Sequence, residues 1–126
     1  MRLLVVEDSP LLRKMFGLAF PHQLHELGQA ENGREAIAVL AGTRDSFDAV
    51  LLDLRMPDMN GAEFIRALRQ LPVHGQTPVI LTTGESDNSD LMRAAIELGV
   101  AAVVKKPWSP QKLRLVVQQV VAPPTG

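Results

Sequence analysis

The sequence predicts an α/β fold, a doubly wound parallel sheet of five strands flanked by five helices. The first observation behind this prediction is a series of short apolar runs that each end in a polar or charged residue. Strands have near-continuous apolar sequences when both faces of their sheet are covered. The second observation is that segments with apolar residues at helical spacing separate these runs. The length of 126 residues suits one domain, which we expect at 1–122, with a tail or linker at 123–126.

The chain opens with a buried strand expected at 2–6, and a helix follows this strand closely. Ser9 and Pro10 indicate the start of the helix, because serine caps helix N-termini and proline suits the first helical position. Pro21 should end the helix. Its apolar residues recur at helical spacing, which predicts a buried face made of Leu11, Leu12, Met15, Phe16 and Ala19.

The segment 24–31 is the most polar of the expected strands, which indicates a strand at the edge of the sheet. His22 and His25 lie near its start. The sequence offers no third ligand beside them, so we expect surface histidines rather than a metal site. The run at 49–52 is entirely apolar and should be the central strand, which Asp53 follows directly.

Two further helices begin with the same capping pattern. Asn32 is followed three residues later by Glu35, and Asn60 is followed in the same way by Glu63. Gly42 is a plausible end for the first of these helices. The expected buried residues of the two helices are Ala36, Ile37, Val39 and Leu40, and then Phe64, Ile65, Leu68 and Leu71.

The last two strands are expected at 79–82 and 101–105, the first of them after a loop at 72–78. Gly99 should end the helix between these strands, and the dipeptide 109–110 repeats the serine–proline helix start. Candidate caps for the helix before Gly99 are Asp87, Asn88 and Ser89. The expected buried residues of the two helices are Leu91, Met92, Ala95, Ile96 and Leu98, and then Leu113, Val116, Val117 and Val120.

The composition excludes several classes of function. The chain has no cysteine, which rules out disulfides, thiolate metal sites and thiol nucleophiles. A net charge of −1 without a basic stripe, and no tyrosine, argue against direct nucleic-acid binding. No apolar run approaches the length of a membrane span, and acids follow the first strand too early for a signal peptide. We therefore expect a cytoplasmic protein that contacts neither a membrane nor nucleic acid.

Chemically useful residues follow four of the apolar runs. Glu7 and Asp8 follow the first run, Asp53 the central one, a threonine pair at 82–83 the fourth and a lysine pair at 105–106 the fifth. Each group alone is ordinary at a turn or surface, but the carboxyl ends of parallel strands meet at one sheet edge. Carboxylates hold Mg²⁺ and can attack phosphorus, while lysine and a hydroxyl suit phosphoryl oxygens. The set predicts a site for a divalent metal and a phosphoryl group.

These residues lie in motifs that resemble the receiver domain of two-component response regulators, a CheY-like fold. The matching motifs are Val5-Val6-Glu7-Asp8-Ser9, Leu52-Asp53-Leu54-Arg55-Met56-Pro57-Asp58-Met59-Asn60-Gly61, Pro78-Val79-Ile80-Leu81-Thr82-Thr83 and Val104-Lys105-Lys106-Pro107-Trp108. The resemblance covers residues 2–121 and implies a flavodoxin-like sheet with the strand order 2-1-3-4-5.

The resemblance implies that Asp53 accepts a phosphoryl group from a histidine kinase or a phosphotransfer protein. It implies Mg²⁺ (or Mn²⁺) among Asp53, Asp8, Glu7 and the backbone carbonyl of Arg55. Asp8 would bind the metal directly, and Glu7 would act through metal-bound water. We further hypothesise that the Arg55 side chain shields the acyl phosphate from water or pairs with an acid.

By the same resemblance, Lys106 contacts the phosphoryl group and Thr83 supplies the hydroxyl that responds to it, with Thr82 as the runner-up. The domain would then switch between two packings. In many members of the family, an aromatic residue on the fifth strand moves inward together with the threonine. Val103 stands at that position here, so this part of the switch is in doubt. Trp108 replaces a commoner phenylalanine and should be a packing variant.

The implied protein is a signalling switch that catalyses only its own phosphorylation and dephosphorylation. A metal-dependent phosphatase would need an Asp-x-Asp pattern, but Pro10 stands two residues after Asp8. A nucleotide-binding flavodoxin relative would need a phosphate-binding first loop, which is absent here. A pseudo-receiver that binds partners without phosphorylation is the remaining alternative. The expected partners are a downstream protein or an output domain, contacted through residues 87–122, and phosphorylation could produce a homodimer.

Overall fold

The five strands form one parallel sheet in the order β2-β1-β3-β4-β5, as the sequence resemblance implied. The computed structural model describes residues 1–56, 58–84 and 89–121, so the tail expected at 123–126 lies outside the described residues. The strands are β1 (Arg2–Val6), β2 (Glu26–Ala30), β3 (Ala49–Asp53), β4 (Val79–Gly84) and β5 (Ala102–Lys106). The helices are α1 (Pro10–Ala19), α2 (Gly33–Ala41), α3 (Gly61–Arg69), α4 (Asp90–Glu97) and α5 (Pro110–Val121).

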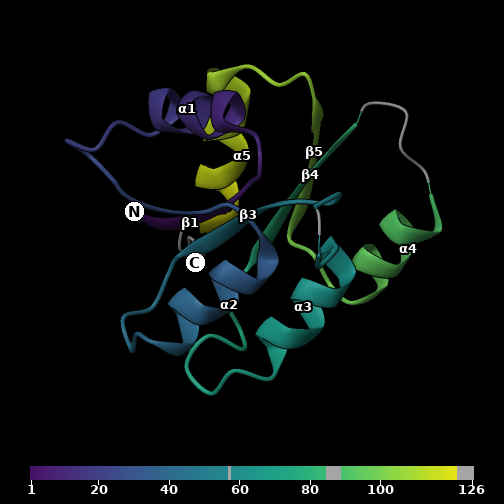
Figure 1. The fold of residues 1–126 in the computed structure, drawn as a ribbon. Helices are drawn as coiled ribbons and strands as arrows, with labels where there is room; N and C mark the ends of the chain where they lie inside the picture. Colours follow the sequence, from purple (N-terminus) through teal and green to yellow (C-terminus); the bar gives the residue numbers. More distant parts are fainter. Residues whose placement is uncertain (57, 85–88, 122–126) are drawn as a thin grey trace, which may run out of the picture.

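Helices cover both faces of the sheet (Figure 1). Helices α1 and α5 lie side by side on one face, and α2, α3 and α4 cover the other. Successive strand residues alternate between these two layers. Leu51, for example, packs in the cluster on the α1–α5 face, and Leu52 packs in the cluster on the opposite face. Burial on both faces explains why β3 is apolar up to Asp53.

The helix starts confirm the predicted caps. The side chains of Ser9, Asn32 and Ser89 accept a backbone hydrogen bond at the starts of α1, α2 and α4. Asn60 and Glu63 form a complete capping box at the start of α3. The other two candidate caps for α4 lie outside the described residues. Caps satisfy backbone donors that the first turn leaves unpaired, so these short helices begin at defined positions.

The predicted helix faces are partly wrong. Leu11, Val39 and Ile96 were expected in the core, but they are 68%, 40% and 45% exposed. The apolar stripe on each helix is wider than its contact with the sheet, so its outermost members remain in solvent. Their neighbours Phe16, Leu40 and Ala95 do face the core.

Among the described strands, β2 pairs only with β1, which confirms the predicted edge position. His22 is exposed as expected. His25 is half-buried at the surface, where its ring packs edge-on against Phe20 at 5.6 Å and its Nδ1 lies 3.4 Å from the Met1 amine. Within the described ranges, no helix has the length and apolar character needed to cross a bilayer.

Candidate functional site

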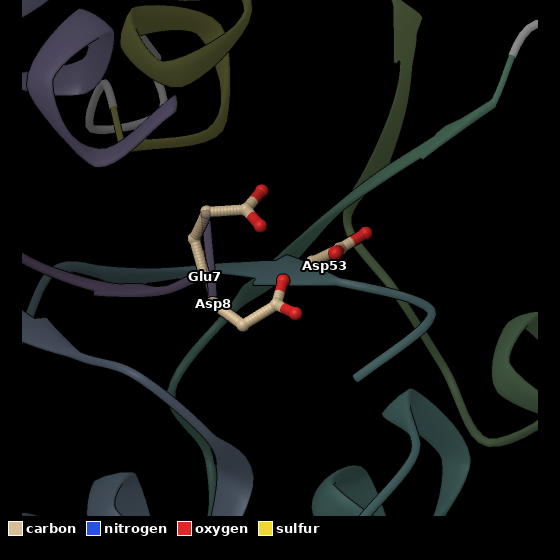
Figure 2. A group of neighbouring side chains, drawn as sticks. All are labelled: Glu7, Asp8 and Asp53. Carbon is tan, nitrogen blue, oxygen red and sulfur yellow. The ribbon is translucent and has the colours of Figure 1, made fainter. Parts of the chain in front are cut away.

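Three carboxylates meet at the carboxyl edge of the sheet (Figure 2). Glu7 and Asp8 follow β1, and Asp53 is the last residue of the neighbouring strand β3. One carboxylate oxygen from each residue lies within 4.8 Å of the others. Glu7 and Asp53 are buried, whereas Asp8 is exposed to solvent. The parallel pairing of β1 and β3 brings these acids together, as predicted from the sequence.

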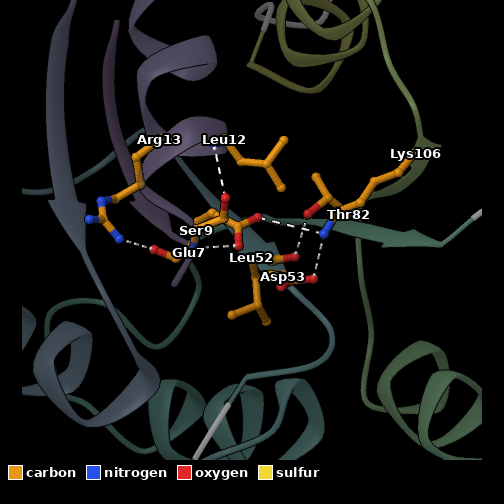
Figure 3. Close-up of polar contacts among 8 residues, drawn as sticks. All are labelled: Glu7, Ser9, Leu12, Arg13, Leu52, Asp53, Thr82 and Lys106. Carbon is orange, nitrogen blue, oxygen red and sulfur yellow. Dashed lines mark hydrogen bonds and ion pairs between the residues drawn. The ribbon is translucent and has the colours of Figure 1, made fainter.

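Lys106 completes the charged site from the end of β5. Its Nζ lies 3.1 Å from Asp53 Oδ1 and 3.7 Å from Glu7 Oε1 (Figure 3). Lys106 is two residues after Val104, which packs on the α1–α5 face, so Lys106 emerges on the same face as Asp53. The adjacent residue Lys105 is on the other face and is exposed.

The surroundings of Glu7 raise the pKa of its carboxyl well above the usual value. Its Oε2 accepts a hydrogen bond from the Ser9 backbone at 3.2 Å, but none of the described residues donates a hydrogen bond to its buried Oε1. Burial, the charge of Asp53 and a hydrogen bond with Asp8 raise the pKa of Glu7 to about 7, against the opposing effects of Ser9 and Lys106. The positive charge of Lys106 therefore does not offset the negative charge of the acidic cluster. Clustered carboxylate oxygens with an unsatisfied buried oxygen fit a hard divalent cation.

The two threonines of β4 lie on opposite faces of the sheet. Thr82 pairs in register with Asp53, and its Oγ1 donates to the Leu52 carbonyl at 3.4 Å. Thr83 pairs with Lys105 on the face covered by α3 and α4. Both side chains are buried. The hydroxyl of Thr82 is thus bonded to β3, while Thr83 lies near the end of β4 on the opposite face of the sheet.

Three other residues singled out from the sequence lie around this edge. Arg55 is exposed two residues after Asp53. Val103 is half-buried and packs in the cluster on the α2–α4 face. Trp108 is buried, and its ring lies 4.8 Å from that of Phe16 on α1. These two rings join the segment after Lys106 to α1.

The sequence reasoning missed two contacts that organise Glu7. It identified Ser9 only as a helix cap, yet the Ser9 N–H binds the Glu7 carboxylate. It assigned no role to Arg13, whose Nη1 donates to the Glu7 carbonyl at 2.8 Å (Figure 3). The sequence offered one signal, an arginine in the first turn of the helix that follows the two acids.

The family model described as the response regulator receiver domain matches residues 3–118. Among curated proteins, Regulatory protein AtoC of Escherichia coli (strain K12) is 37% identical over 119 residues, which are 94% of this chain and 24% of AtoC. Transcriptional regulatory protein ResD of Bacillus subtilis (strain 168) is 32% identical over 117 residues, which are 93% of this chain and 46% of ResD. The chain spans less than half the length of these two relatives.

Solved structures resemble the fold over nearly all of both chains. The chemotaxis response regulator CheY4 of Vibrio cholerae has a TM-score of 0.84 at 30% identity, covering 94% of this chain and 97% of that one. The receiver domain of the sensor histidine kinase PA1611 from Pseudomonas aeruginosa PAO1 has a TM-score of 0.85 at 21% identity, covering 97% of this chain and 98% of that one. That crystal structure has a magnesium ion coordinated in its active-site cleft, but the likeness at this identity concerns the fold.

Proposed function

This chain belongs to the response regulator receiver domain family, and from that membership we propose that Asp53 accepts a phosphoryl group from a histidine kinase or a phosphotransfer protein. The observation that carries the proposal is the meeting of Asp53 with two further acids and Lys106 at one sheet edge. A lone strand-end aspartate has no such surroundings. The acceptor carboxylate is buried but reaches the edge at which ligands bind in this class of sheet.

The acidic cluster fits Mg²⁺ or Mn²⁺, because its oxygens gather within 4.8 Å and the buried Oε1 of Glu7 lacks a donor in the described part of the chain. Asp8 and Asp53 would bind the ion directly, Glu7 would act through a bound water, and the Arg55 backbone carbonyl would be a further ligand. The bound ion supplies positive charge that offsets the phosphoryl oxygens during transfer.

The chain's own residues account for the transfer chemistry. One carboxylate oxygen of Asp53 forms a bond to phosphorus while the bond from phosphorus to the donor's imidazole nitrogen breaks. The imidazole leaves with the electron pair of that bond and takes up a proton. Lys106, already 3.1 Å from Asp53 Oδ1, would turn its ammonium group to the phosphoryl oxygens and stabilise their charge.

The phosphoryl group would then bias the domain between two packings. Thr83 lies at the end of β4 beneath the α4 layer, and donation of its hydroxyl to a phosphoryl oxygen would couple the acidic edge to that layer. Val103 cannot contribute an aromatic ring to this change, so we propose that the threonine carries it. Residues 87–122 would form the surface that changes on phosphorylation. A downstream protein, an output domain or a second copy of the chain would bind there.

The relatives that extend well beyond this chain support residues 1–122 as a receiver domain followed by a tail or linker at 123–126. The domain would act as a switch and process only its own phosphoryl group. A pseudo-receiver without phosphorylation would not require the close approach of Lys106 to Asp53.

The proposal can be tested by intact-mass analysis after incubation with acetyl phosphate and Mg²⁺. The expected result is one added phosphoryl group on the wild type and none on Asp53→Asn. Chelation of the metal should abolish the addition. A wild type that gains no mass with acetyl phosphate or with a phosphorylated histidine donor would instead support the pseudo-receiver.

A further inference from the structure

Arg13 links three segments at the acidic edge without touching the carboxylates of the site. It lies on α1, and its Nη1 donates to the Glu7 carbonyl at 2.8 Å. Its Nη2 lies 3.7 Å from Glu31 Oε1, just after β2. The Arg13 side chain is 16% exposed, so its guanidinium group is largely withdrawn from solvent. This placement is unusual for a residue with no predicted role.

The contacts of Arg13 close a frame around the backbone of Glu7. The Glu7 N–H donates to the Ala30 carbonyl of β2 at 3.0 Å, and Glu31 is the next residue after Ala30. On the other side of Glu7, Arg13 donates to the Glu7 carbonyl, and the same guanidinium group lies beside the Glu31 carboxylate. The peptide groups on both sides of Glu7 are therefore anchored to neighbouring elements. The Ser9 N–H fixes its carboxylate from a third direction.

We propose that Arg13 is a positioning residue that holds Glu7 and the following Asp8 in place for the divalent cation. This inference rests on the proposed function, because it concerns the same acidic site. Groups that orient metal ligands through hydrogen bonds commonly change metal affinity by 10–100-fold when removed. Two contacts from one planar guanidinium suit this task better than the single-point ammonium of lysine.

A positioning role and a purely electrostatic role predict opposite effects. Removing a positive charge beside three acids should by itself strengthen cation binding. Releasing the Glu7 backbone should instead weaken it, because the oxygens would no longer be held for the ion. A role limited to fold stability would lower the melting temperature and leave the affinity unchanged. Arg13→Met separates these three cases.

The experiment is titration calorimetry with Mg²⁺ alone, at fixed ionic strength and without a phosphodonor. The variants are Arg13→Met, Arg13→Lys and Glu31→Gln, each checked for folding by its thermal transition. Arg114→Met is the matched control, because Arg114 also donates to a backbone carbonyl, that of Ala19 at 3.3 Å, and contacts none of the three acids within the described residues.

The expected result is about tenfold weaker Mg²⁺ binding in Arg13→Met, with Arg13→Lys between that variant and the wild type. Arg114→Met should stay within about twofold, and Glu31→Gln should too, because exposed ion pairs contribute little. A folded Arg13→Met with unchanged or stronger binding would overturn the inference. Should Arg13→Met fail to fold, wild-type affinity in Arg13→Lys would overturn it. A wild type that does not bind Mg²⁺ would instead refute the metal dependence of the proposed function.

Discussion

Lys106 Nζ lies 3.1 Å from Asp53 Oδ1, a contact between the last residues of β5 and β3 that are 53 positions apart in the chain. The same ammonium group lies 3.7 Å from Glu7 Oε1. Strand β4 separates β3 from β5, and it presents Gly84 at the position paired with Lys106. The lysine side chain therefore reaches across β4 to Asp53. The charge of Lys106 is thus placed where a phosphoryl group on Asp53 would need it.

Replacing Lys106 should impair phosphorylation without removing the acceptor. In Lys106→Met the phosphoryl oxygens lose their nearest cation, so we expect the rate of self-phosphorylation with acetyl phosphate to fall at least about tenfold. Intact-mass time courses at saturating Mg²⁺ measure this rate. Lys105→Met is the matched control, because that lysine is exposed on the other face, and it should stay within about twofold of the wild type. Equal rates in the two variants would contradict the assignment of Lys106.

The raised pKa of Glu7 predicts that the metal-free protein loses stability as the pH rises. Between the usual value of 4.5 and about 7, the folded state holds a proton on Glu7 that the unfolded state releases. The free energy of unfolding should therefore fall across this window, by on the order of 2 kcal/mol for this buried group. Urea unfolding in EDTA at pH 5 and pH 8 measures the fall.

Glu7→Gln is the control for this pH effect. The amide does not titrate, so the variant should lose the Glu7 share of the pH dependence and keep that of the other groups. The comparison uses the difference between the two proteins rather than either slope alone. Identical pH dependence in wild type and variant would show that Glu7 titrates near its usual value.

The two threonines of β4 should give separable effects. Thr82→Val loses the bond to the Leu52 carbonyl and should destabilise the fold by about 1 kcal/mol while preserving the response to phosphorylation. Thr83→Val should still gain the phosphoryl mass but lose the accompanying conformational change. Hydrogen exchange of α4 with and without acetyl phosphate measures that change. A normal response in Thr83→Val, with loss in Thr82→Val, would reverse the assignment.

Arg55 should affect how long the acyl phosphate lasts. It is exposed two residues after Asp53, where a long cationic side chain can shield the phosphoryl group or pair with an acid. We expect Arg55→Ala to change the dephosphorylation rate severalfold, measured by the decay of the phosphorylated mass after the donor is removed. Arg66→Ala, an exposed arginine in the last turn of α3, is the control. Equal decay in wild type and Arg55→Ala would end this hypothesis.

The sequence was sufficient to predict the strands, the caps and the acids that meet at the sheet edge. Apolar runs and caps are local signals, and parallel pairing then brings the strand ends together without further information. The exposure of Leu11 and the packing of the half-buried His25 against Phe20 were not predictable, because they depend on how much of a helix or loop its neighbours cover. The Arg13 contact with Glu7 needs the relative placement of α1 and β1, which periodicity does not specify.

The most direct test of the central claim is to locate the phosphoryl group within the chain. Borohydride reduces an acyl phosphate to an alcohol, so a phosphorylated aspartate becomes homoserine, which peptide mass spectrometry can place. After incubation with acetyl phosphate and Mg²⁺, we predict homoserine at position 53 and at no other aspartate. Samples without Mg²⁺ should show none. Homoserine at position 8, or none at position 53, would contradict the account.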